Sequence, residues 1–364
     1  MIMTRVLPVF LLFVFLIVIS GCHTRVIQTH PWPVPDGQYD SEYPYQPASK
    51  ALEKLLETVH FLNCVAYYRG YIFSPEVRLK RQHITDEVIK THAVQRTFFN
   101  HTASGTATVV YAQDVQLALL TCAHIVDFPD TLYTYRTDAF DQPTEYLESV
   151  AIKIRQQNYI PDLPLANNLR ILVSDRSLDV ALVGQTLPRP PLRPIRVFDF
   201  PVGSAKELQW GTFVYILGFP KGQKMVTSGL VSSPNRTVQG SFLVDAPFNK
   251  GFSGGIVVAI RDGIPNFELV GLMNSVSAES ELILVPEKGF LKKRLVEEKP
   301  YRGEVYVRNL RRINYGVTYA IGIDAIREFL FANRDKLQQM GYDYSLFFES
   351  PLPRITPPGQ TKRR

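Results

Sequence analysis

The sequence predicts an all-β fold, either a pair of antiparallel barrels or a β-sandwich, closed by a C-terminal helix. Three observations favour this class. The 364 residues include 26 prolines and 22 glycines among many β-branched and aromatic residues, a composition typical of short strands joined by turns. Short apolar or alternating runs recur from about residue 105 onward. A helical pattern returns only near the end of the chain, so the strand–helix alternation of a parallel sheet is not indicated.

The composition is that of a globular protein with a sizeable core. Hydrophobic residues make up 45% of the chain and charged residues 20%, which excludes long disorder and collagen-like repeats. The net charge of +6 comes from scattered basic residues and gives no support to nucleic-acid binding. Three cysteines are too few for a disulfide framework or a four-ligand zinc site. Without a phosphate-binding loop or metal-ligand spacing, we expect no cofactor and no metal.

The N-terminus has the layout of an export signal. A short basic start over residues 1–5 precedes an apolar run over residues 6–19, which is too short to span a bilayer comfortably. The run ends in Ile19-Ser20-Gly21-Cys22, which resembles the lipobox of bacterial lipoproteins. That resemblance implies a signal peptide over residues 1–21, lipidation of Cys22 and a membrane-anchored lipoprotein outside the cytoplasm, on the periplasmic side of the bacterial envelope. An ordinary cleaved signal with a chance cysteine is the alternative.

A spacer and a helical extension are predicted next. Residues 22–48 are rich in proline and polar residues without periodicity, which is typical of a spacer. The extension covers residues 49–104. Its amphipathic helix is predicted from apolar residues at helical spacing, namely Leu52, Leu55, Leu56, Val59 and Leu62.

The main domain is predicted over residues 105–341 and the tail over residues 342–364. Strands are expected at residues 106–111, 116–121, 150–154, 169–174, 179–183, 212–217, 255–260 and 269–273. A C-terminal helix is expected to begin at Asp324 as its N-cap and to stop at Gly341.

The segment Gly251-Phe252-Ser253-Gly254-Gly255 is the sharpest local signal of chemistry. A nucleophilic serine needs main-chain N–H donors where the substrate carbonyl oxygen gains charge, and glycines let the chain bend at that point. By itself the motif also fits an ordinary Ser-Gly-Gly turn.

Two further segments supply a candidate base and a candidate carboxylate. His124 follows the predicted strand over residues 116–121, and Asp179 opens the apolar strand that follows Ser177-Leu178. Each residue taken alone is more often structural than catalytic. With Ser253 they stand in the order His, Asp, Ser, one of several convergent solutions to serine acyl transfer. Asp175 is a rival carboxylate, and we prefer Asp179 because it abuts the apolar run, where it can be shielded beneath the histidine.

These motifs resemble those of the trypsin-like serine peptidases with the chymotrypsin fold, and most of all those of bacterial HtrA or Deg-type proteases. Residues 214–222 and 226–232 resemble the paired second-barrel strands of that family, and residues 244–251 and 269–274 resemble the segments around its serine. Residues 315–330 look like its closing strand and helix. The resemblance covers roughly residues 105–340 and implies a two-barrel fold.

The resemblance implies a role for each candidate residue. Ser253 is the expected nucleophile, His124 the general base, and Asp179 the group that orients the imidazole and stabilises its protonated form. The main-chain N–H groups of Gly251 and Ser253 are the expected oxyanion hole.

The resemblance also implies where the primary specificity pocket lies. Pro247 is expected at its floor, and Asn274, Ser275 and Val276 at its wall. None of these residues is a carboxylate, so a buried lysine or arginine of the substrate would stay unpaired. We therefore expect small or medium aliphatic residues before the scissile bond. Residues 278–315 are expected to leave the barrel near this wall and to cover the pocket in part.

Three features depart from the family pattern, and the pairing of two cysteines is left undecided by the sequence. Phe252 stands where the family usually has Asp or Asn, which leaves the orientation of the Gly251 amide open. The spacing from His124 to Asp179 is longer than usual for HtrA-type enzymes and implies an insertion around residues 133–168. The short stretch after residue 340 implies that the family's PDZ domain is missing. Cys64 and Cys122 either form a disulfide or stay free, with Cys122 as a small buried apolar residue.

These observations predict a membrane-tethered serine endopeptidase that hydrolyses extracytoplasmic polypeptides without a cofactor or metal. The alternative is a catalytically silent trypsin-like protein that binds polypeptide or scaffolds an assembly of the cell envelope, and Phe252 favours it. An exported serine esterase fits less well, because the triad order and the strand motifs indicate the peptidase barrel.

Overall fold

The computed structural model describes residues 35–44, 46–138, 142–163, 165–238, 240–247, 249–286 and 303–343, with the side chains of residues 275–279 and 311–315 left aside. The chain divides into two compact units, Met1–Asp36 and Gly37–Arg364, and the second unit carries the features below. The predicted signal peptide, Cys22 and tail residues 344–364 lie outside the described residues. None of the described helices is both long and apolar enough to cross a membrane.

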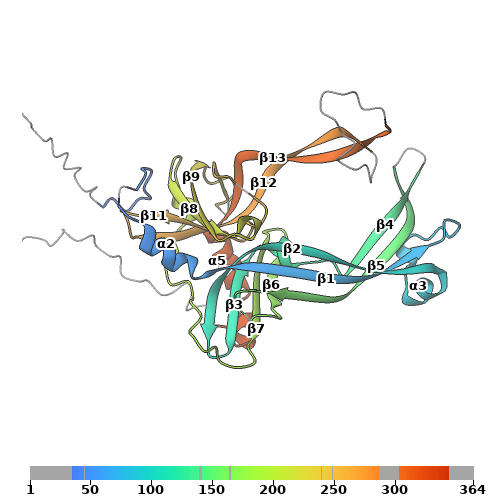
Figure 1. Ribbon diagram of the computed structural model, residues 1–364. Coiled ribbons are helices and arrows are strands. Elements are labelled where there is room, and N and C mark those ends of the chain that lie inside the picture. Colours follow the sequence, from blue (N-terminus) through green and yellow to red (C-terminus); the bar gives the residue numbers. More distant parts are fainter. Residues whose placement is uncertain are drawn as a thin grey trace, which may run out of the picture. The chain divides into compact units, whose positions relative to one another are not determined.

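The first sheet holds seven antiparallel strands in the order β4-β5-β1-β2-β3-β7-β6 (Figure 1). The strands are β1 (Val59–Phe73), β2 (Ala93–Gln113), β3 (Gln116–Thr121), β4 (Thr131–Thr137), β5 (Pro143–Tyr159), β6 (Arg170–Asp175) and β7 (Val180–Thr186). Successive residues of β3 and β7 are buried along most of each strand, as expected where both faces of a sheet are covered. β4 and β5 occupy the stretch for which an insertion was predicted.

The second sheet closes into a six-stranded barrel in the order β10-β13-β12-β11-β8-β9. The strands are β8 (Phe213–Gly218), β9 (Met225–Ser233), β10 (Phe242–Val244), β11 (Ile256–Ile260), β12 (Phe267–Pro286) and β13 (Val305–Gly322). Closure leaves the barrel without free edges. β12 and β13 continue as a paired hairpin from Ala278 and Ile313 to Pro286 and Val305. The open sheet followed by a closed barrel confirms the predicted all-β fold and is consistent with the two-barrel, chymotrypsin-like type.

Helices are few and short among the described residues. They are α2 (Ser49–Leu56), α3 (Asp86–His92), α4 (Ala123–Val126), α5 (Ile323–Ala332) and α6 (Arg334–Gln339), with 3-10 turns η1 (Arg81–His83), η2 (Ala205–Glu207) and η3 (Pro220–Gly222). α5 buries one apolar face, which includes Ile326 and Leu330.

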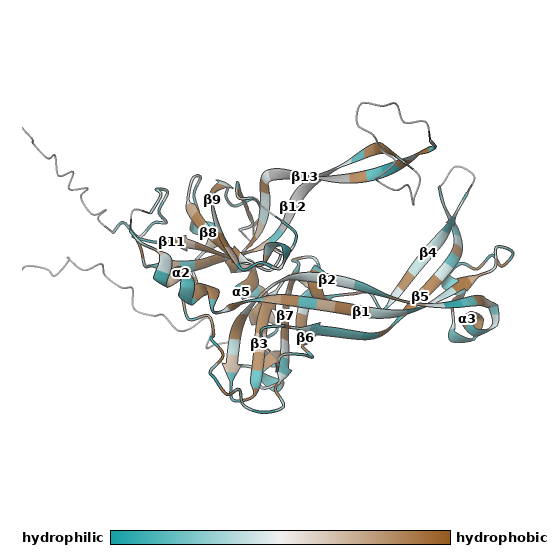
Figure 2. Ribbon diagram, in the orientation of Figure 1, coloured by the Kyte–Doolittle hydropathy of each residue, from teal (hydrophilic) through white to brown (hydrophobic). Residues whose placement is uncertain are grey.

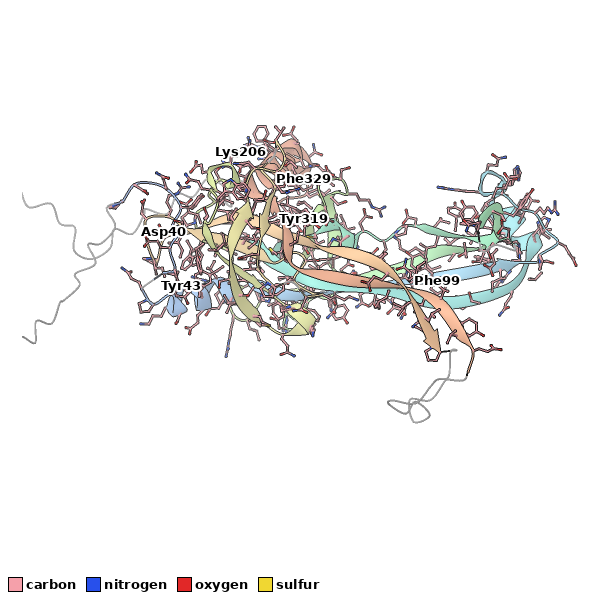
Figure 3. All side chains as sticks on the ribbon, turned by 90° about the horizontal axis from the view of Figure 1, so that it is seen from above. Asp40, Tyr43, Phe99, Lys206, Tyr319 and Phe329 are labelled. Atoms are coloured by element: carbon pink, nitrogen blue, oxygen red, sulfur yellow. The ribbon has the colours of Figure 1, made fainter. Side chains whose placement is uncertain are left out.

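One continuous apolar core joins the two sheets. It includes Leu62 and Leu119 from the first sheet and Leu217 and Val257 from the second, all with no exposed surface. Figure 2 shows hydrophobic residues along these central strands. The first residues of the unit also belong to the second barrel, since the Asp40 N–H donates to the carbonyl oxygen of β11 residue Ile260 (2.9 Å). Figure 3 shows the place of Asp40 and its neighbour Tyr43.

The prediction of a helical extension over residues 49–104 was wrong beyond its first two turns. α2 ends at Leu56, and Val59 and Leu62 belong to β1 instead. Alternate residues of β1 are buried from Leu62 to Gly70, which is the period of a strand, and β1 pairs with β2 and β5. The helix was predicted from the spacing of five apolar residues, but pairing with strands far along the chain decides the conformation of this segment. The first sheet therefore begins well before residue 105.

The C-terminal helix also differs from its prediction. The helical stretch breaks at Asn333 into α5 and α6, and Gly322 is the N-cap of α5. The Asp324 carboxylate instead accepts the N–H groups of Ala205 (2.7 Å) and Lys206 (3.2 Å) in η2. Gly341 ends the second helix with a φ of 85°, as predicted for its stop.

Candidate active site

His124 is carried by a short helix at the end of β3. Ala123, Ile125 and Val126, its neighbours in α4, are buried and fix this helix on the core. Helical geometry then turns the histidine side chain to the outside, where 48% of it is exposed. The sequence Ala-His-Ile-Val thus combines three core anchors with one outward imidazole.

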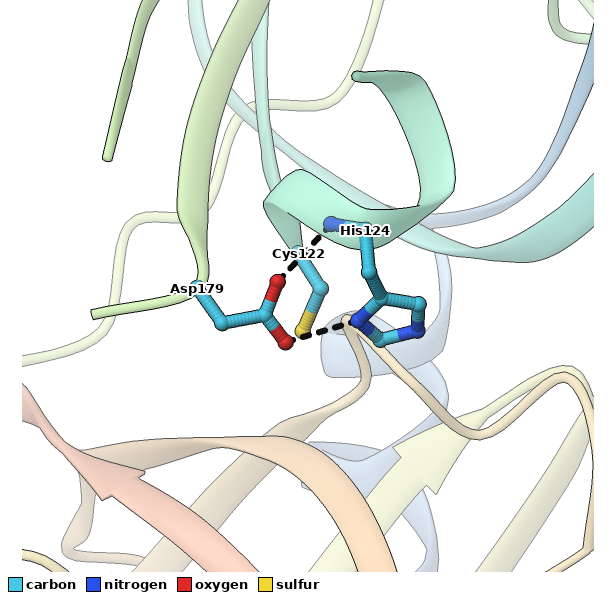
Figure 4. Close-up of side chains that lie close together, drawn as sticks. All are labelled: Cys122, His124 and Asp179. Atoms are coloured by element: carbon cyan, nitrogen blue, oxygen red, sulfur yellow. Dashed lines mark hydrogen bonds and ion pairs between the residues drawn. The ribbon is translucent and has the colours of Figure 1, made fainter. Parts of the chain in front are cut away.

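Asp179 is the last residue of the turn before β7 and contacts His124 at two points (Figure 4). Its Oδ1 accepts the His124 main-chain N–H (2.8 Å), and its Oδ2 lies 2.7 Å from His124 Nδ1. The Asp179 carbonyl oxygen also accepts the N–H of Ala123 (3.2 Å). The pairing of β3 with β7, which ends at Thr121 and Ala181, places the two segments side by side. A carboxylate accepts at Nδ1, so the Nδ1–H tautomer is favoured and Nε2 is left to act as a base.

Asp175, the other candidate carboxylate, is hydrogen-bonded within its own turn and not to His124. Its Oδ1 accepts the N–H groups of Ser177 (2.8 Å) and Leu178 (2.9 Å) and so stabilises the turn between β6 and β7. That turn delivers Asp179 with a φ of 62°, a left-handed conformation that costs a non-glycine residue energy. Asp179, not Asp175, therefore contacts His124.

The Ser253 loop is shaped by its glycines. Gly251 has a φ of 107°, and a Cβ there would collide with the carbonyl oxygen of Phe219. Gly254 has a φ of 81°, and a Cβ there would collide with the carbonyl oxygen of Thr106. Both positions require glycine on grounds of conformation and of space.

Phe252 anchors this loop in the core. Its side chain is 2% exposed and packs against Gly218, where a Cβ would come within 2.9 Å of the ring. The departure from the family pattern at this position therefore supplies a packed partner for the loop. The buried ring thus anchors the turn that precedes Ser253.

Hydrogen bonds to the preceding carbonyl groups orient the N–H groups of Gly251 and Ser253. The Lys250 carbonyl oxygen accepts the N–H of Lys221 (2.8 Å), and in a trans peptide the N–H of Gly251 then points the opposite way. The Phe252 carbonyl oxygen accepts the N–H of Gly255 (2.8 Å), which orients the N–H of Ser253 in the same manner. Among the described residues neither the Gly251 nor the Ser253 amide donates to the protein, as an oxyanion hole requires.

The Ser253 hydroxyl already has a hydrogen-bond partner. Its Oγ donates to the carbonyl oxygen of Asn274 (2.9 Å), and within the described residues it makes no hydrogen bond with His124. The loop is nevertheless tied to the histidine segment. Thr106 donates its N–H to the Ser253 carbonyl oxygen (2.8 Å) and accepts the Thr121 hydroxyl at its own carbonyl (2.7 Å). A rotation about the serine χ1 angle, between staggered rotamers, is the movement that frees the hydroxyl.

Cys122 is a free, fully buried thiol beneath the site, and Cys64 is also free and buried. The two cysteines form no disulfide, so of the two predicted alternatives the free, buried thiols are the one that applies. The Cys122 Sγ donates to the carbonyl oxygen of Met273 (3.2 Å). Burial, and next the charge of Asp179, raise the pKa of the Cys122 thiol well above its usual range.

The Cys122, His124 and Asp179 side chains lie close enough for a metal, with one potential ligand atom of each within 4.8 Å of the others. Their chemistry does not fit one. His124 Nδ1 and Asp179 Oδ2 already hold each other, and the raised thiol pKa keeps Cys122 protonated, whereas a metal binds the thiolate. We assign these contacts to the histidine–aspartate pair.

Comparison with known proteins shows a similarity over part of the chain. Residues 105–272 match the family described as the trypsin-like peptidase domain. This stretch is therefore similar to the trypsin-like peptidases. A solved structure of the HtrA-type protease AlgW with a decapeptide is also similar, with 14% identity, a TM-score of 0.41, and coverage of 82% of this chain and 68% of that chain. A comparison with curated protein sequences finds no match.

In the second barrel, Thr318 joins the segments predicted to form the specificity pocket. β12 residue Val276 pairs with Thr318 on β13, and the Thr318 hydroxyl donates to the carbonyl oxygen of Ala246 (2.9 Å), next to Pro247. Pro247 is exposed and Asn274 is half-buried, while the side chains of Ser275 and Val276 lie outside the described atoms. Part of the predicted cover, residues 287–302, also lies outside the described residues.

Sequence reasoning missed Thr106 and Thr318. Both are buried threonines whose hydroxyls bond a carbonyl of the segment 246–251, Thr106 to Gly251 and Thr318 to Ala246. Nothing in the residues around them distinguishes these threonines from others in strands.

Proposed function

We propose that the chain is a serine endopeptidase in which Ser253 is the nucleophile, His124 the general base and Asp179 the orienting carboxylate. The observation that carries the proposal is the pair of hydrogen bonds that His124 donates to the Asp179 carboxylate. In addition, the Gly251 and Ser253 amides donate to no acceptor among the described residues. The pair leaves the His124 Nε2 available as a base, and the two amides are available as donors to an oxyanion; acyl transfer needs both.

The reaction follows from these positions. Ser253 Oγ leaves the Asn274 carbonyl, attacks the substrate carbonyl carbon and passes its proton to His124 Nε2. The N–H groups of Gly251 and Ser253 stabilise the oxyanion that forms. The imidazolium, paired with Asp179, then protonates the leaving amine as the peptide C–N bond breaks. His124 then deprotonates a water molecule, which attacks the acyl carbon. As the ester bond to Ser253 Oγ breaks, the imidazolium returns the proton to Oγ.

Labelling with a fluorophosphonate probe tests this proposal. The probe phosphonylates an activated serine, and peptide mapping by mass spectrometry should place the adduct on Ser253. Ser253→Ala and His124→Ala should abolish labelling and casein cleavage, with melting temperatures near that of the wild type. Casein cleavage that persists in Ser253→Ala would remove the assignment.

A catalytically silent polypeptide-binding protein is the second candidate. The hydrogen bond from the Ser253 hydroxyl to Asn274, in place of one to His124, favours it. A folded wild type that binds polypeptide but never reacts with the probe would support this candidate. Rapid labelling would exclude it.

For location we propose an extracytoplasmic lipoprotein that is anchored to a membrane through Cys22, on the periplasmic side of the bacterial envelope, and acts on extracytoplasmic polypeptides. The support is the sequence before Cys22. The native protein should partition into detergent, and Cys22→Ala should release it from membranes or stall its processing. A native N-terminus that is unmodified and begins beyond Cys22 would refute the tether.

A further inference from the structure

A cavity lies away from the candidate active site. Its volume is about 320 Å³, and it is bounded by α2, by the connection between the two sheets and by the turn from β11 to β12. Most of its lining is apolar, with Ala51, Phe200, Pro201, Ile264, Pro265 and Phe267. Ligand pockets range from about 300 to 1,000 Å³, so this one has room for a single large side chain.

Two lysines stand at the rim without a counter-charge. Lys50 and Lys54 both line the cavity, and as residues i and i+4 of α2 they lie on one face of the helix. Neither forms an ion pair with a carboxylate of the described residues. Like charges at this spacing repel each other, so an anion between them would relieve that repulsion.

The other charged residues of the lining are already paired. Arg196 bonds Asp199 (3.1 Å) across three residues. The carboxylate of Glu268 is buried and accepts from Arg261 Nε (3.0 Å) and the Tyr39 hydroxyl (2.8 Å). The cavity therefore combines an apolar floor with a rim whose unpaired charge is positive.

We propose that this cavity binds an acidic polypeptide segment, with one aromatic or aliphatic side chain in the cavity and flanking carboxylates on Lys50 and Lys54. The volume of the cavity suits the apolar side chain, and the two lysines at its mouth suit the carboxylates. Size and charge thus fit the same ligand.

The proposal does not depend on the peptidase reaction. The cavity lies on α2 and on the loops at residues 196–201 and 264–266, none of which carries a candidate catalytic residue. A bound segment would nevertheless contact the connection that runs between the two sheets.

Fluorescence anisotropy of a labelled peptide tests the proposal. The probe is fluorescein-Gly-Asp-Phe-Asp-Gly, added to the full chain carrying Ser253→Ala so that it is not cleaved. The wild-type cavity should bind it at least about fivefold more tightly than the Lys50→Glu/Lys54→Glu double variant, and more tightly than probes with Asn for Asp or Ala for Phe. Ala51→Phe, which fills the cavity from the same helix, should abolish binding.

The matched control carries the same charge change elsewhere. Lys90→Glu/Lys336→Glu alters two exposed lysines on α3 and α6 and should leave the affinity unchanged. Equal weakening in both double variants would overturn the proposal, since it would reflect net charge alone. Binding of 3-phenylpropanoate as tight as that of the peptide would also overturn it and assign the cavity to small carboxylates. Melting temperatures of all variants distinguish lost binding from lost folding.

Discussion

The Thr106 hydroxyl donates to the Gly251 carbonyl oxygen at 2.8 Å and accepts the Phe219 N–H at 2.9 Å. Thr106 is fully buried on β2, and Gly251 belongs to the Ser253 loop of the second barrel. Thr106 therefore fixes the orientation of the peptide group between Gly251 and Phe252, directly after the Gly251 N–H that we propose as an oxyanion donor. The geometry of the loop depends on how the two sheets pack.

Thr106→Val should impair the site more than the fold. Valine keeps the shape but leaves a buried carbonyl and a buried N–H unpaired, at about 1 to 3 kcal/mol each in the free energy of unfolding. We expect the fluorophosphonate rate at Ser253 to fall at least about tenfold, since the Gly251 peptide loses its anchor. Thr106→Ser retains the hydroxyl and should react at nearly the wild-type rate. An unchanged rate in the valine variant would show that the loop is ordered without this bond.

Asp179→Asn and Asp175→Asn form a matched pair of substitutions. An amide at residue 179 no longer enforces the Nδ1–H tautomer of His124, and in a histidine–serine system this costs about 10⁴-fold in turnover. Asp175→Asn keeps an oxygen that can accept from Ser177 and Leu178, so turnover should change less than about threefold. Peptide hydrolysis by the two variants gives the comparison. A larger loss at residue 175 would reverse our assignment of the carboxylate.

Gly254→Ala and Gly263→Ala separate collision from backbone strain. The two glycines have similar φ values, 81° and 87°, but a Cβ at residue 254 meets Thr106 whereas nothing lies within 4 Å of one at residue 263. Left-handed alanine alone costs about 1 to 2 kcal/mol. Urea unfolding should show that loss for Gly263→Ala and a loss larger by about 2 kcal/mol or more for Gly254→Ala. Equal losses in the free energy of unfolding would mean that the Ser253 loop can move away from the added Cβ without an energetic cost.

Alkaline pH should destabilise the fold through its buried thiols. Burial raises the pKa of both Cys64 and Cys122, so the folded state holds these protons more tightly than the unfolded state does. The resulting stability is complete below the unfolded thiol pKa of about 8.5 and declines as pH rises above it. Urea unfolding between pH 7 and 9.5 should show this decline, and Cys64→Ala should reduce its slope. A slope that is identical in the variant would contradict a buried, protonated Cys64.

Cleavage of a peptide library should show a preference for small or medium aliphatic residues before the scissile bond. Pro247 and the segment after Met273 offer no carboxylate to a basic side chain. Sequencing of the products gives the residue preference. A dominant preference for Lys or Arg would show that the pocket lies elsewhere or has an acidic wall.

Local patterns determined much of this protein from the sequence. The strand predicted over residues 116–121 coincides with β3, because its apolar run is short, ends at a turn and is buried as a unit. His124, Asp179 and Ser253 could be singled out because residue type and chain order carry the chemistry. The choice of Asp179 over Asp175 also came from local context, and the contact with His124 agrees with it.

Tertiary structure decided what depends on partners far along the chain. β1 is a strand rather than a helix because it pairs with β2 and β5, and a run of apolar residues cannot reveal that pairing. Thr106 and Gly251 are 145 residues apart, yet one hydrogen bond joins them. Lys50 and Lys54 resemble any exposed helical pair until the connection and the β11–β12 turn close an apolar cavity beside them. Side-chain contacts of this kind arise from the packing of whole sheets, which residue spacing alone does not specify.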